Sequence, residues 1–193
     1  MTSEQLDVLT NVPVLRGERV LLRGWREEDL APFAALNADA GVTEFLPKRL
    51  TRAESDAFAG RIGAHFREHG FGLWALEVPG VAPFIGFTGL AVPRFEAHFT
   101  PGVEVGWRIA REHWGQGYAP EAARVALHHG FEAAELREIV SFTSVSNLRS
   151  RRVMEKIGMR RDAADDFDHP GLPVGHPLRR HVLYRIRRPA RPR

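Results

Sequence analysis

The stretch "REHWGQGYAPEAA", residues 111–123, places two glycines and a proline between a strand-like run and a run rich in alanine. Residues 116–119 precede or open the helix that this pattern predicts, so their backbone N–H groups have no partner inside it. Together with the helix dipole, these groups form a site for an anion. Gly115 and Gly117 have no Cβ to keep a phosphate away from the backbone, and Pro120 fits the first helical turn. The loop is therefore predicted to bind a phosphate compound.

The spacing of this loop excludes two common nucleotide sites. A Walker loop needs a Lys followed by Ser or Thr at the start of the helix, and those places hold no such pair. The dinucleotide fingerprint needs a third glycine where Pro120 stands. One alternative stays open, in which the two glycines serve only a tight connection between strand and helix.

The rest of the chain alternates strand-like and helix-like patterns, which predicts an α/β fold. The 193 residues, 44% of them hydrophobic, suffice for one core, and no linker or repeat divides the chain. Three closely spaced strands predict an antiparallel meander, and Thr51 followed by Glu54 is a capping-box pattern. In order, the predicted elements are a strand at 18–25, helices at 26–39 and 50–70, strands at 71–78, 84–92 and 102–110, a helix at 119–135, a strand at 137–145, a helix at 147–158 and a strand at 179–186.

The composition excludes several kinds of chemistry. The chain has no cysteine, so disulfides, thiolate nucleophiles and Cys-ligated zinc cannot contribute. The N-terminal "MTSEQLDVLTNVPV" carries acids and no apolar core of signal-peptide length, and no later stretch has the length of a membrane span. We therefore expect a cytoplasmic protein with no membrane partner.

The basic character of the chain, with a net charge of +3, is concentrated at its C-terminal end. Seven of the 27 Lys and Arg residues lie between Arg179 and Arg193, so the rest has 20 basic and 24 acidic residues, a net charge of −4. The final "RRPARPR" fits neither a regular strand nor a helix. No aromatic residues are interleaved with these arginines for stacking on bases. Nucleic acid is therefore not expected as a partner, and such a role would have to rest on the tail.

Two stretches together, "GVEVGWRIAREHWGQGYAPEAA" and "SVSNLRSRRVMEKIGM", closely resemble motifs A and B of the GNAT superfamily of N-acetyltransferases. The resemblance is closest to the branch that acetylates ribosomal protein N-termini (RimJ/RimL-like). It runs from about Glu18 to Arg187 and implies one acetyltransferase domain over 1–193, with a core at 18–187 and flexible ends at 1–13 and 189–193. The implied architecture is a mixed central sheet of about six to seven strands flanked by about four helices. The implied co-substrate is acetyl coenzyme A, with no metal.

The family's loop begins with Arg or Gln, followed by two residues, Gly, one residue, and Gly or Ala. Here Trp114, Gly117 and Ala119 stand in the three places, so the first position lacks its charge. Gln116 or Arg111 could compensate, and Arg149 or Arg152 could reach the outer phosphate of the cofactor. The alternative for each is a solvated surface side chain. By resemblance, the cofactor-binding residues are Trp107, Arg108, Ile109, Trp114, Gly115, Gln116, Gly117, Tyr118, Ala119, Asn147, Ser150 and Arg152.

The strand before the loop offers a general base. Glu104 alternates against Val105 and Trp107, which places it on the opposite face together with Arg108. In the family this strand carries the base, often acting through a water. The alternative is a Glu that pairs with Arg108 or is simply solvated. A backbone N–H near 107–109 is expected to polarise the thioester carbonyl.

The short helix after residue 147 offers a group for the leaving thiolate. Many family members have a Tyr where Met154 stands, and Met cannot donate a proton. Ser150 is the predicted substitute, because it heads the apolar stripe of this helix. A plain structural Ser that satisfies an N–H at the helix start is the alternative. Asn147, at or next to the N-cap, is expected to cap the helix and, by resemblance, to bond the pantetheine arm.

Histidines gather in "DFDHPGLPVGHPLRRH", residues 166–181, but their spacing matches no zinc pattern. By resemblance, this loop borders the acceptor entrance.

The leading hypothesis is direct acetyl transfer in a ternary complex to a protein N-terminus or a small amine, by a monomer or homodimer. The alternative from another class is a non-catalytic sensor that binds acyl coenzyme A.

Overall fold

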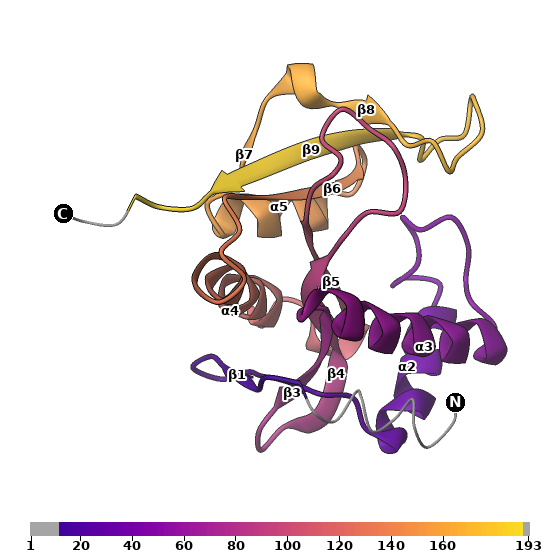
Figure 1. The fold of residues 1–193 in the computed structure, drawn as a ribbon. Coiled ribbons are helices and arrows are strands. Elements are labelled where there is room, and N and C mark those ends of the chain that lie inside the picture. The colour runs from indigo at the N-terminus through magenta and orange to yellow at the C-terminus, as the bar shows by residue number, and fades with distance from the viewer. Residues whose placement is uncertain (1–11, 191–193) are drawn as a thin grey trace.

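The computed structural model describes residues 12–190, and within them nine strands form one mixed sheet (Figure 1). The strand order is β1-β2-β3-β4-β5-β6-β9-β7, and β8 also pairs with β9. Every pairing is antiparallel except that of β5 with β6. The strands are β1 (Leu15–Arg16), β2 (Leu21–Arg23), β3 (Leu73–Val78), β4 (Ala82–Ala91), β5 (Glu104–Ile109), β6 (Glu138–Ser144), β7 (Arg160–Arg161), β8 (Phe167–Asp168) and β9 (Arg180–Arg187).

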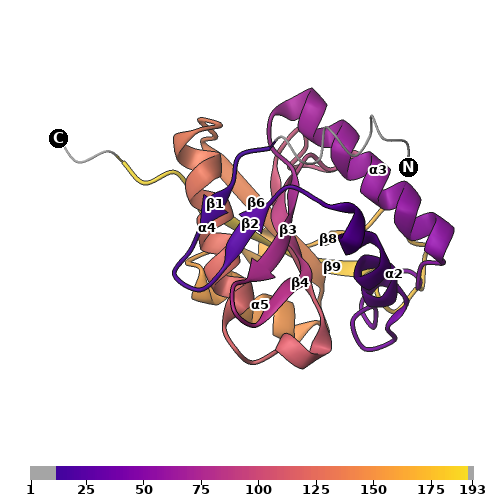
Figure 2. The same cartoon turned by 90° about the horizontal axis from the view of Figure 1, so that it is seen from below.

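Four α-helices cover the two faces of this sheet. Helices α2 and α3 lie on one side, and α4 and α5 lie next to each other on the other side (Figures 1 and 2). The predicted capping box is confirmed, because the Thr51 hydroxyl accepts from the N–H of Glu54 and the Glu54 carboxylate accepts from the N–H of Thr51. The helical elements are η1 (Glu27–Asp29), α2 (Leu30–Ala38), α3 (Arg52–His69), η2 (Arg111–His113), α4 (Tyr118–Glu132), α5 (Leu148–Lys156) and η3 (Ala163–Asp165).

The predicted meander and helices are confirmed, but the number of strands is larger than the six to seven expected. The segment predicted as the first strand, 18–25, forms only β2 in its middle, and Leu15–Arg16 pairs with it as β1. The stretch 159–178, for which the sequence predicts no strand or helix, holds β7 and β8. Two-residue strands are too short for an alternating pattern, so the sequence gives no sign of them. The predicted flexible ends lie largely outside the described residues, since 1–11 and 191–193 are not described.

The sheet opens between β5 and β6. These parallel strands share one registered pair, Glu104 with Val140, and the N–H of Val140 donates to the carbonyl of Val103 at 2.9 Å. Beyond that pair β5 and β6 separate, whereas β5 stays paired with β4 along the whole of Glu104–Ile109. The N–H of Ala110 donates to the carbonyl of Ile85 in β4, so Ala110 directs its backbone groups toward β4. Alternate residues of a strand direct their backbone groups to opposite edges. Trp107 and Ile109, which lie an odd number of residues from Ala110, therefore direct their N–H and C=O groups into the opening.

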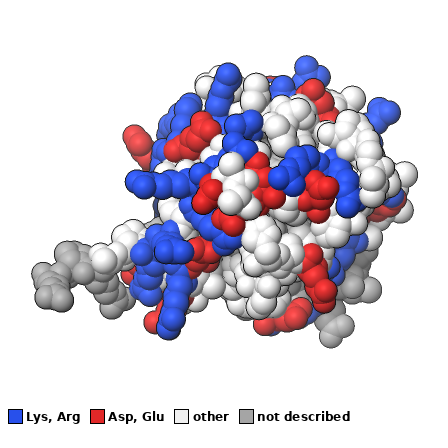
Figure 3. All heavy atoms as spheres, turned by 90° about the horizontal axis from the view of Figure 1, so that it is seen from above, with Lys and Arg blue, Asp and Glu red and all other residues white. Residues whose placement is uncertain are grey.

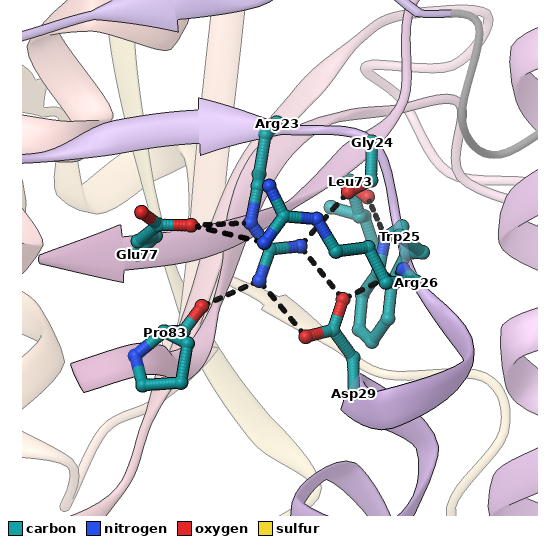
Figure 4. A network of polar contacts seen from close by, with 8 residues as sticks. All are labelled: Arg23, Gly24, Trp25, Arg26, Asp29, Leu73, Glu77 and Pro83. Carbon is teal, nitrogen blue, oxygen red and sulfur yellow. Dashed lines mark hydrogen bonds and ion pairs between the residues drawn. The ribbon is translucent and has the colours of Figure 1, made fainter. Parts of the chain in front are cut away.

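A buried ion-pair network fixes the other end of the sheet (Figure 4). The Arg23 side chain of β2 is 4% exposed and makes a bidentate pair with Asp29 of η1, with distances of 2.7 and 2.9 Å. Its Nε also donates to Glu77 of β3 at 2.7 Å, and it bonds the carbonyl of Pro83. One guanidinium thus joins the first strands to the start of α2, which sets the position of that helix over the sheet.

The arginines near the C-terminal end are largely paired with acids. Arg185 contacts Asp165 and Glu138, both at 2.7 Å, and Arg187 contacts Glu138 at 3.0 Å. On the face seen in Figure 3, basic and acidic side chains interleave. The positive charge predicted for this end is therefore partly neutralised by contacts that the sequence alone did not reveal. Within the described residues, no helix is both long and apolar enough to cross a membrane.

Candidate functional site

A cavity of about 340 Å³ lies where β5 and β6 separate. Its walls come from the end of β5, from the start of α4 with the loop before it, from α5, and from the segment between α2 and α3. We call residues 114–117 the glycine loop. The described residues that line the cavity are Gly41, Val42, Phe45, Leu46, Trp107, Arg108, Ile109, His113, Trp114, Gly115, Gly117, Tyr118, Ala119, Pro120, Asn147, Arg149, Ser150, Arg152, Val153 and Lys156.

The glycine loop has the backbone that an anion site needs. Gly115 and Gly117 have φ values of 77° and 83°, in the left-handed region that favours glycine. A Cβ at Gly115 would meet no atom within 4 Å, so the space beside the loop is open. Among the described residues, the N–H groups of 115–119 have no hydrogen-bond partner. A row of free donors at the start of a 15-residue helix fits a diphosphate.

Arg19 supports this loop from behind, a contact that the sequence does not reveal. Its Nη1 donates to the carbonyl of Gln116 at 3.0 Å, and its Nη2 pairs with Glu121 at 2.7 Å. Its guanidinium carbon lies 5.1 Å from the ring centroid of Tyr118. Arg19 is 97 residues from Gln116 in sequence, so no local pattern signals it. Gln116, predicted to bind the cofactor, does not line the cavity, and its carbonyl serves this contact instead.

The aromatic residue at the first position of the loop has a cation beside it. The indole N–H of Trp114 donates to the carbonyl of Ile109 at 2.7 Å, which holds the ring against the end of β5. The Arg149 guanidinium carbon lies 4.6 Å from this ring, and the guanidinium pairs with Glu44 at 2.6 Å. Arg149 thus brings the positive charge that Trp114 lacks. The sequence predicts Arg149 at the outer phosphate, whereas Arg111, predicted with Gln116 to compensate for the missing charge, packs along Gly41 and does not line the cavity.

The start of α5 confirms the predicted cap and leaves the predicted hydroxyl donor without a protein partner among the described residues. Asn147 caps the helix, because its Oδ1 accepts from the N–H of Ser150 at 3.2 Å while its Nδ2 donates to Thr143 at 3.0 Å. The backbone N–H of Ser150 is thus satisfied by Asn147. Among the described residues the Ser150 hydroxyl has no partner, and Ser150 lines the cavity. Met154, at the position of the family's Tyr, is 1% exposed and belongs to the core.

Glu104 and Arg108 share one face of β5 but do not interact. The alternative in which they pair is wrong, since Glu104 has no ion pair or hydrogen bond among the described residues. Burial raises the pKa of Glu104 to about 8. Arg108 bonds the Asn37 side chain, and burial lowers the pKa of Arg108 to about 10. Arg108 lines the cavity, whereas Glu104 lies at the start of β5, outside the lining.

The histidines of the 166–181 segment join an aromatic cluster instead of a metal site. The rings of His169 and His181 are 5.1 Å apart, and Phe142 and Phe167 pack against both. Burial lowers the pKa of both histidines. Within residues 12–190, no group of three or more His, Asp or Glu side chains is arranged to hold a metal ion.

Comparisons with known proteins give one matching family model and several relatives. The model described as "Acetyltransferase (GNAT) domain" matches residues 19–160. The uncharacterized protein YkkB of Bacillus subtilis is 30% identical over 143 residues, which cover 74% of this chain and 82% of YkkB. The acetyltransferase of Agrobacterium tumefaciens has a TM-score of 0.73 at 26% identity, over 91% of this chain and 95% of that one. RimJ of Mycobacterium smegmatis, solved with CoA-disulfide, has a TM-score of 0.71 at 22% identity, over 91% and 86%, a likeness of fold alone.

Proposed function

The chain belongs to the GNAT acetyltransferase family, and from that membership we propose that it transfers the acetyl group of acetyl coenzyme A to a primary amine in a ternary complex. One observation carries the proposal: Gly115 and residues 117–119, whose N–H groups are free, line the same cavity as the end of β5 and Ser150. An anion-binding helix start, a strand edge with free backbone groups and a hydroxyl donor are the parts that thioester transfer requires.

The glycine loop is proposed to hold the diphosphate of coenzyme A. The N–H groups of 115 and 117–119 would donate to its oxygens, and the N-terminal dipole of α4 favours the negative charge. Arg152 and Lys156 on α5 line the same cavity and provide positive charge for the outer phosphate. Asn147 would bond the pantetheine arm through the amide N–H that Thr143 does not use. The cofactor, once bound, supplies the thioester whose acetyl carbon is attacked.

The residues around the opening are proposed to carry the proton transfers. Glu104, as general base, would take a proton from the acceptor amine through a water. The backbone N–H groups of Trp107 and Ile109, which face the opening, would donate to the carbonyl oxygen as charge develops on it. As the new C–N bond forms and the C–S bond breaks, the Ser150 hydroxyl would donate to the leaving thiolate.

The acceptor class is proposed from the resemblance to the RimJ/RimL-like branch: an N-terminal amine of a protein, with a small amine as the other candidate. The alternative of a non-catalytic sensor relied on the absent Tyr at position 154. The free Ser150 hydroxyl in the cavity supplies another donor for the leaving group, which favours the enzyme.

The first experiment is calorimetric titration of the protein with acetyl coenzyme A, followed by thiol release in the presence of pooled amines and N-terminal peptides. We expect micromolar affinity and thiol release with one pool. Binding without release by any pool would support the sensor. No binding would refute the assignment of the glycine loop, and Gly117→Glu, which puts a carboxylate where the diphosphate would lie, serves as the negative control.

A further inference from the structure

Arg108 is a partly buried cation, and no acidic side chain among the described residues pairs with it. It projects from β5 on the face covered by α2 and α3, where its guanidinium carbon lies 5.3 Å from the ring centroid of Phe87 and 5.8 Å from that of Phe58. One amino group donates to Asn37, and its other N–H groups have no partner among the described residues. Burial is the cause of its lowered pKa, with no contribution from a carboxylate.

The environment of Arg23, which is fully buried, differs from that of Arg108. Arg23 is surrounded by Asp29 and Glu77, which balance its charge. Buried charges in proteins are normally paired, because an unpaired one costs several kcal/mol of desolvation. Arg108 has no acidic partner among the described residues, and it lines the cavity. Its anion is therefore expected to come from a ligand.

The position of Arg108 places that ligand on the α2 and α3 side of the opening, away from the glycine loop. The acceptor amine is expected on this side. The glycine loop leads into α4, which packs on the opposite face of the sheet from α2 and α3. Arg108 is bonded to Asn37 of α2 and stacks on Phe58 of α3. The diphosphate end of the co-substrate and the Arg108 side chain therefore approach the opening from different faces.

The cavity offers no acid to a polycationic acceptor, since the described residues that line it include no Asp or Glu. Of its cations, Arg152 and Lys156 are proposed to meet the outer phosphate of the co-substrate and Arg149 pairs with Glu44, which leaves Arg108 for the acceptor. Glu104 lies on the same face of β5, four residues before Arg108, which is about 13 Å along the strand. Its pKa of about 8 keeps the carboxyl protonated, and therefore neutral, below that pH. A polyamine would meet repulsion here, whereas a carboxylate would find the planar fork of donors that guanidinium groups offer.

We propose that the acceptor carries a carboxylate in addition to its amine, and that Arg108 binds this carboxylate and sets the specificity of the enzyme. The proposal rests on the proposed function, since it names the acceptor class of the same site. Two sources share this chemistry: a free amino acid, through its α-carboxylate, and a peptide whose first residue is acidic.

Matched acceptor pairs test the proposal on the full-length protein. One arm compares free amino acids with their carboxamides, and the other compares C-terminally amidated peptides that begin with Asp or with Asn. For at least one arm, we expect wild-type kcat/KM to be about tenfold or more higher for the carboxylate than for its neutral counterpart. The arm that shows the preference identifies the source of the carboxylate.

Two substitutions assign the preference to Arg108. Arg108→Gln removes the charge and should bring the ratio of kcat/KM values close to one, with acetyl coenzyme A affinity changed less than about twofold. Asn37→Asp keeps the shape of the partner side chain and supplies an internal carboxylate beside Arg108, so it should also abolish the preference. Arg61→Gln is the matched control, because Arg61 lies 5.4 Å from the ring of Phe58 on the exposed surface of α3. It should leave the ratio unchanged.

Equal kcat/KM for the two members of every pair in the wild type would overturn the proposal, as would a ratio that survives Arg108→Gln. If that variant does not fold, Asn37→Asp decides the question by the same ratio. Transfer without a carboxylate preference defeats this inference alone. Binding of acetyl coenzyme A without transfer to any amine would defeat the proposed function, and this proposal with it.

Discussion

The guanidinium carbon of Arg149, on α5, lies 4.6 Å from the ring centroid of Trp114, at the start of the glycine loop. A cation over an aromatic face at a half-exposed site contributes about 0.5–1 kcal/mol. Its partner Glu44 is 51% exposed, and exposed ion pairs contribute little. Arg149 therefore acts mainly through the ring.

Removing this cation should weaken acetyl coenzyme A binding. Arg149→Ala is expected to lower affinity by about 2- to 5-fold, and Trp114→Leu should lower it similarly, because either change removes the same contact. Glu44→Gln is the control and should have almost no effect. Calorimetry on the two single variants and the double variant gives the coupling energy. Fully additive effects would mean that the two residues act separately.

Arg19 is expected to act on the cofactor without touching it. Arg19→Ala removes the hydrogen bond to the Gln116 carbonyl and the pair with Glu121, so the free N–H groups of the loop become less ordered. The KM for acetyl coenzyme A should rise by about fivefold, the equivalent of about 1 kcal/mol, with little change in kcat. Arg16→Ala on the same hairpin is the matched control. A fall in kcat at unchanged KM would contradict this positioning role.

Ser150→Ala should slow the chemical step. Loss of the donor to the leaving thiolate is expected to lower kcat by up to about 10²-fold while calorimetric affinity for acetyl coenzyme A is retained. The cap of α5 stays intact in this variant, because Asn147 accepts from the backbone N–H of residue 150. An unchanged kcat, with chemistry shown to be rate-limiting by single-turnover measurement, would remove Ser150 from the mechanism.

Glu104 should set the pH dependence of transfer. Burial raises its pKa to about 8, and a general base acts in its deprotonated form. Wild-type kcat/KM should therefore rise with pH and reach half of its plateau near pH 8. Glu104→Gln should lower kcat by about 10²-fold or more and remove the rise of kcat/KM that is half complete near pH 8. The rise caused by deprotonation of the acceptor amine itself persists in the variant, which separates the two ionisations.

The same carboxyl also links stability to pH. A Glu in the unfolded chain ionises near pH 4.3, whereas the folded protein holds this proton to about pH 8. Its contribution to the free energy of unfolding is therefore complete below about pH 4 and is lost as the pH rises through 8. The Tm of Glu104→Gln should fall less between pH 5 and pH 9 than that of the wild type. An equal fall in both proteins would show that Glu104 is ionised throughout.

The buried Arg23 network should make Asp29 a large contributor to stability. Asp29→Ala leaves a guanidinium that is 4% exposed with one carboxylate fewer, and breaking such a pair costs about 3–5 kcal/mol. Urea unfolding should show this loss, while Asp56→Ala, which breaks the exposed pair with Arg52, should cost less than about 0.5 kcal/mol. A loss below 1 kcal/mol for Asp29→Ala would mean that Glu77 alone neutralises Arg23.

The features predictable from the sequence are those set by nearby residues. The Thr51 and Glu54 capping box, the meander and the glycine loop all follow from spacings of a few residues. The Asn147 cap belongs to the same class, since its partner is three residues away.

The features missed depend on contacts between distant parts of the chain. Arg19 reaches a carbonyl 97 residues away, and Arg149 a carboxylate 105 residues away. The sequence also cannot show that Arg108 has no acidic partner, because an unpaired cation can be recognised only when every neighbour in space is known. The separation of β5 from β6 has no local signal either, since both strands show ordinary apolar patterns.

The opening between β5 and β6 leaves an unfilled strand position inside a sheet. Unpaired edges normally occur at the outside of a sheet, where charged residues or short lengths protect them from other chains, but this one is enclosed by α5 and by the segment between α2 and α3. On the proposed function, the pantetheine arm would run along Trp107 and Ile109 in the place of the absent strand. The bound co-substrate would then be a structural component, which at a free concentration c stabilises the fold against unfolding by RT ln(1 + c/Kd).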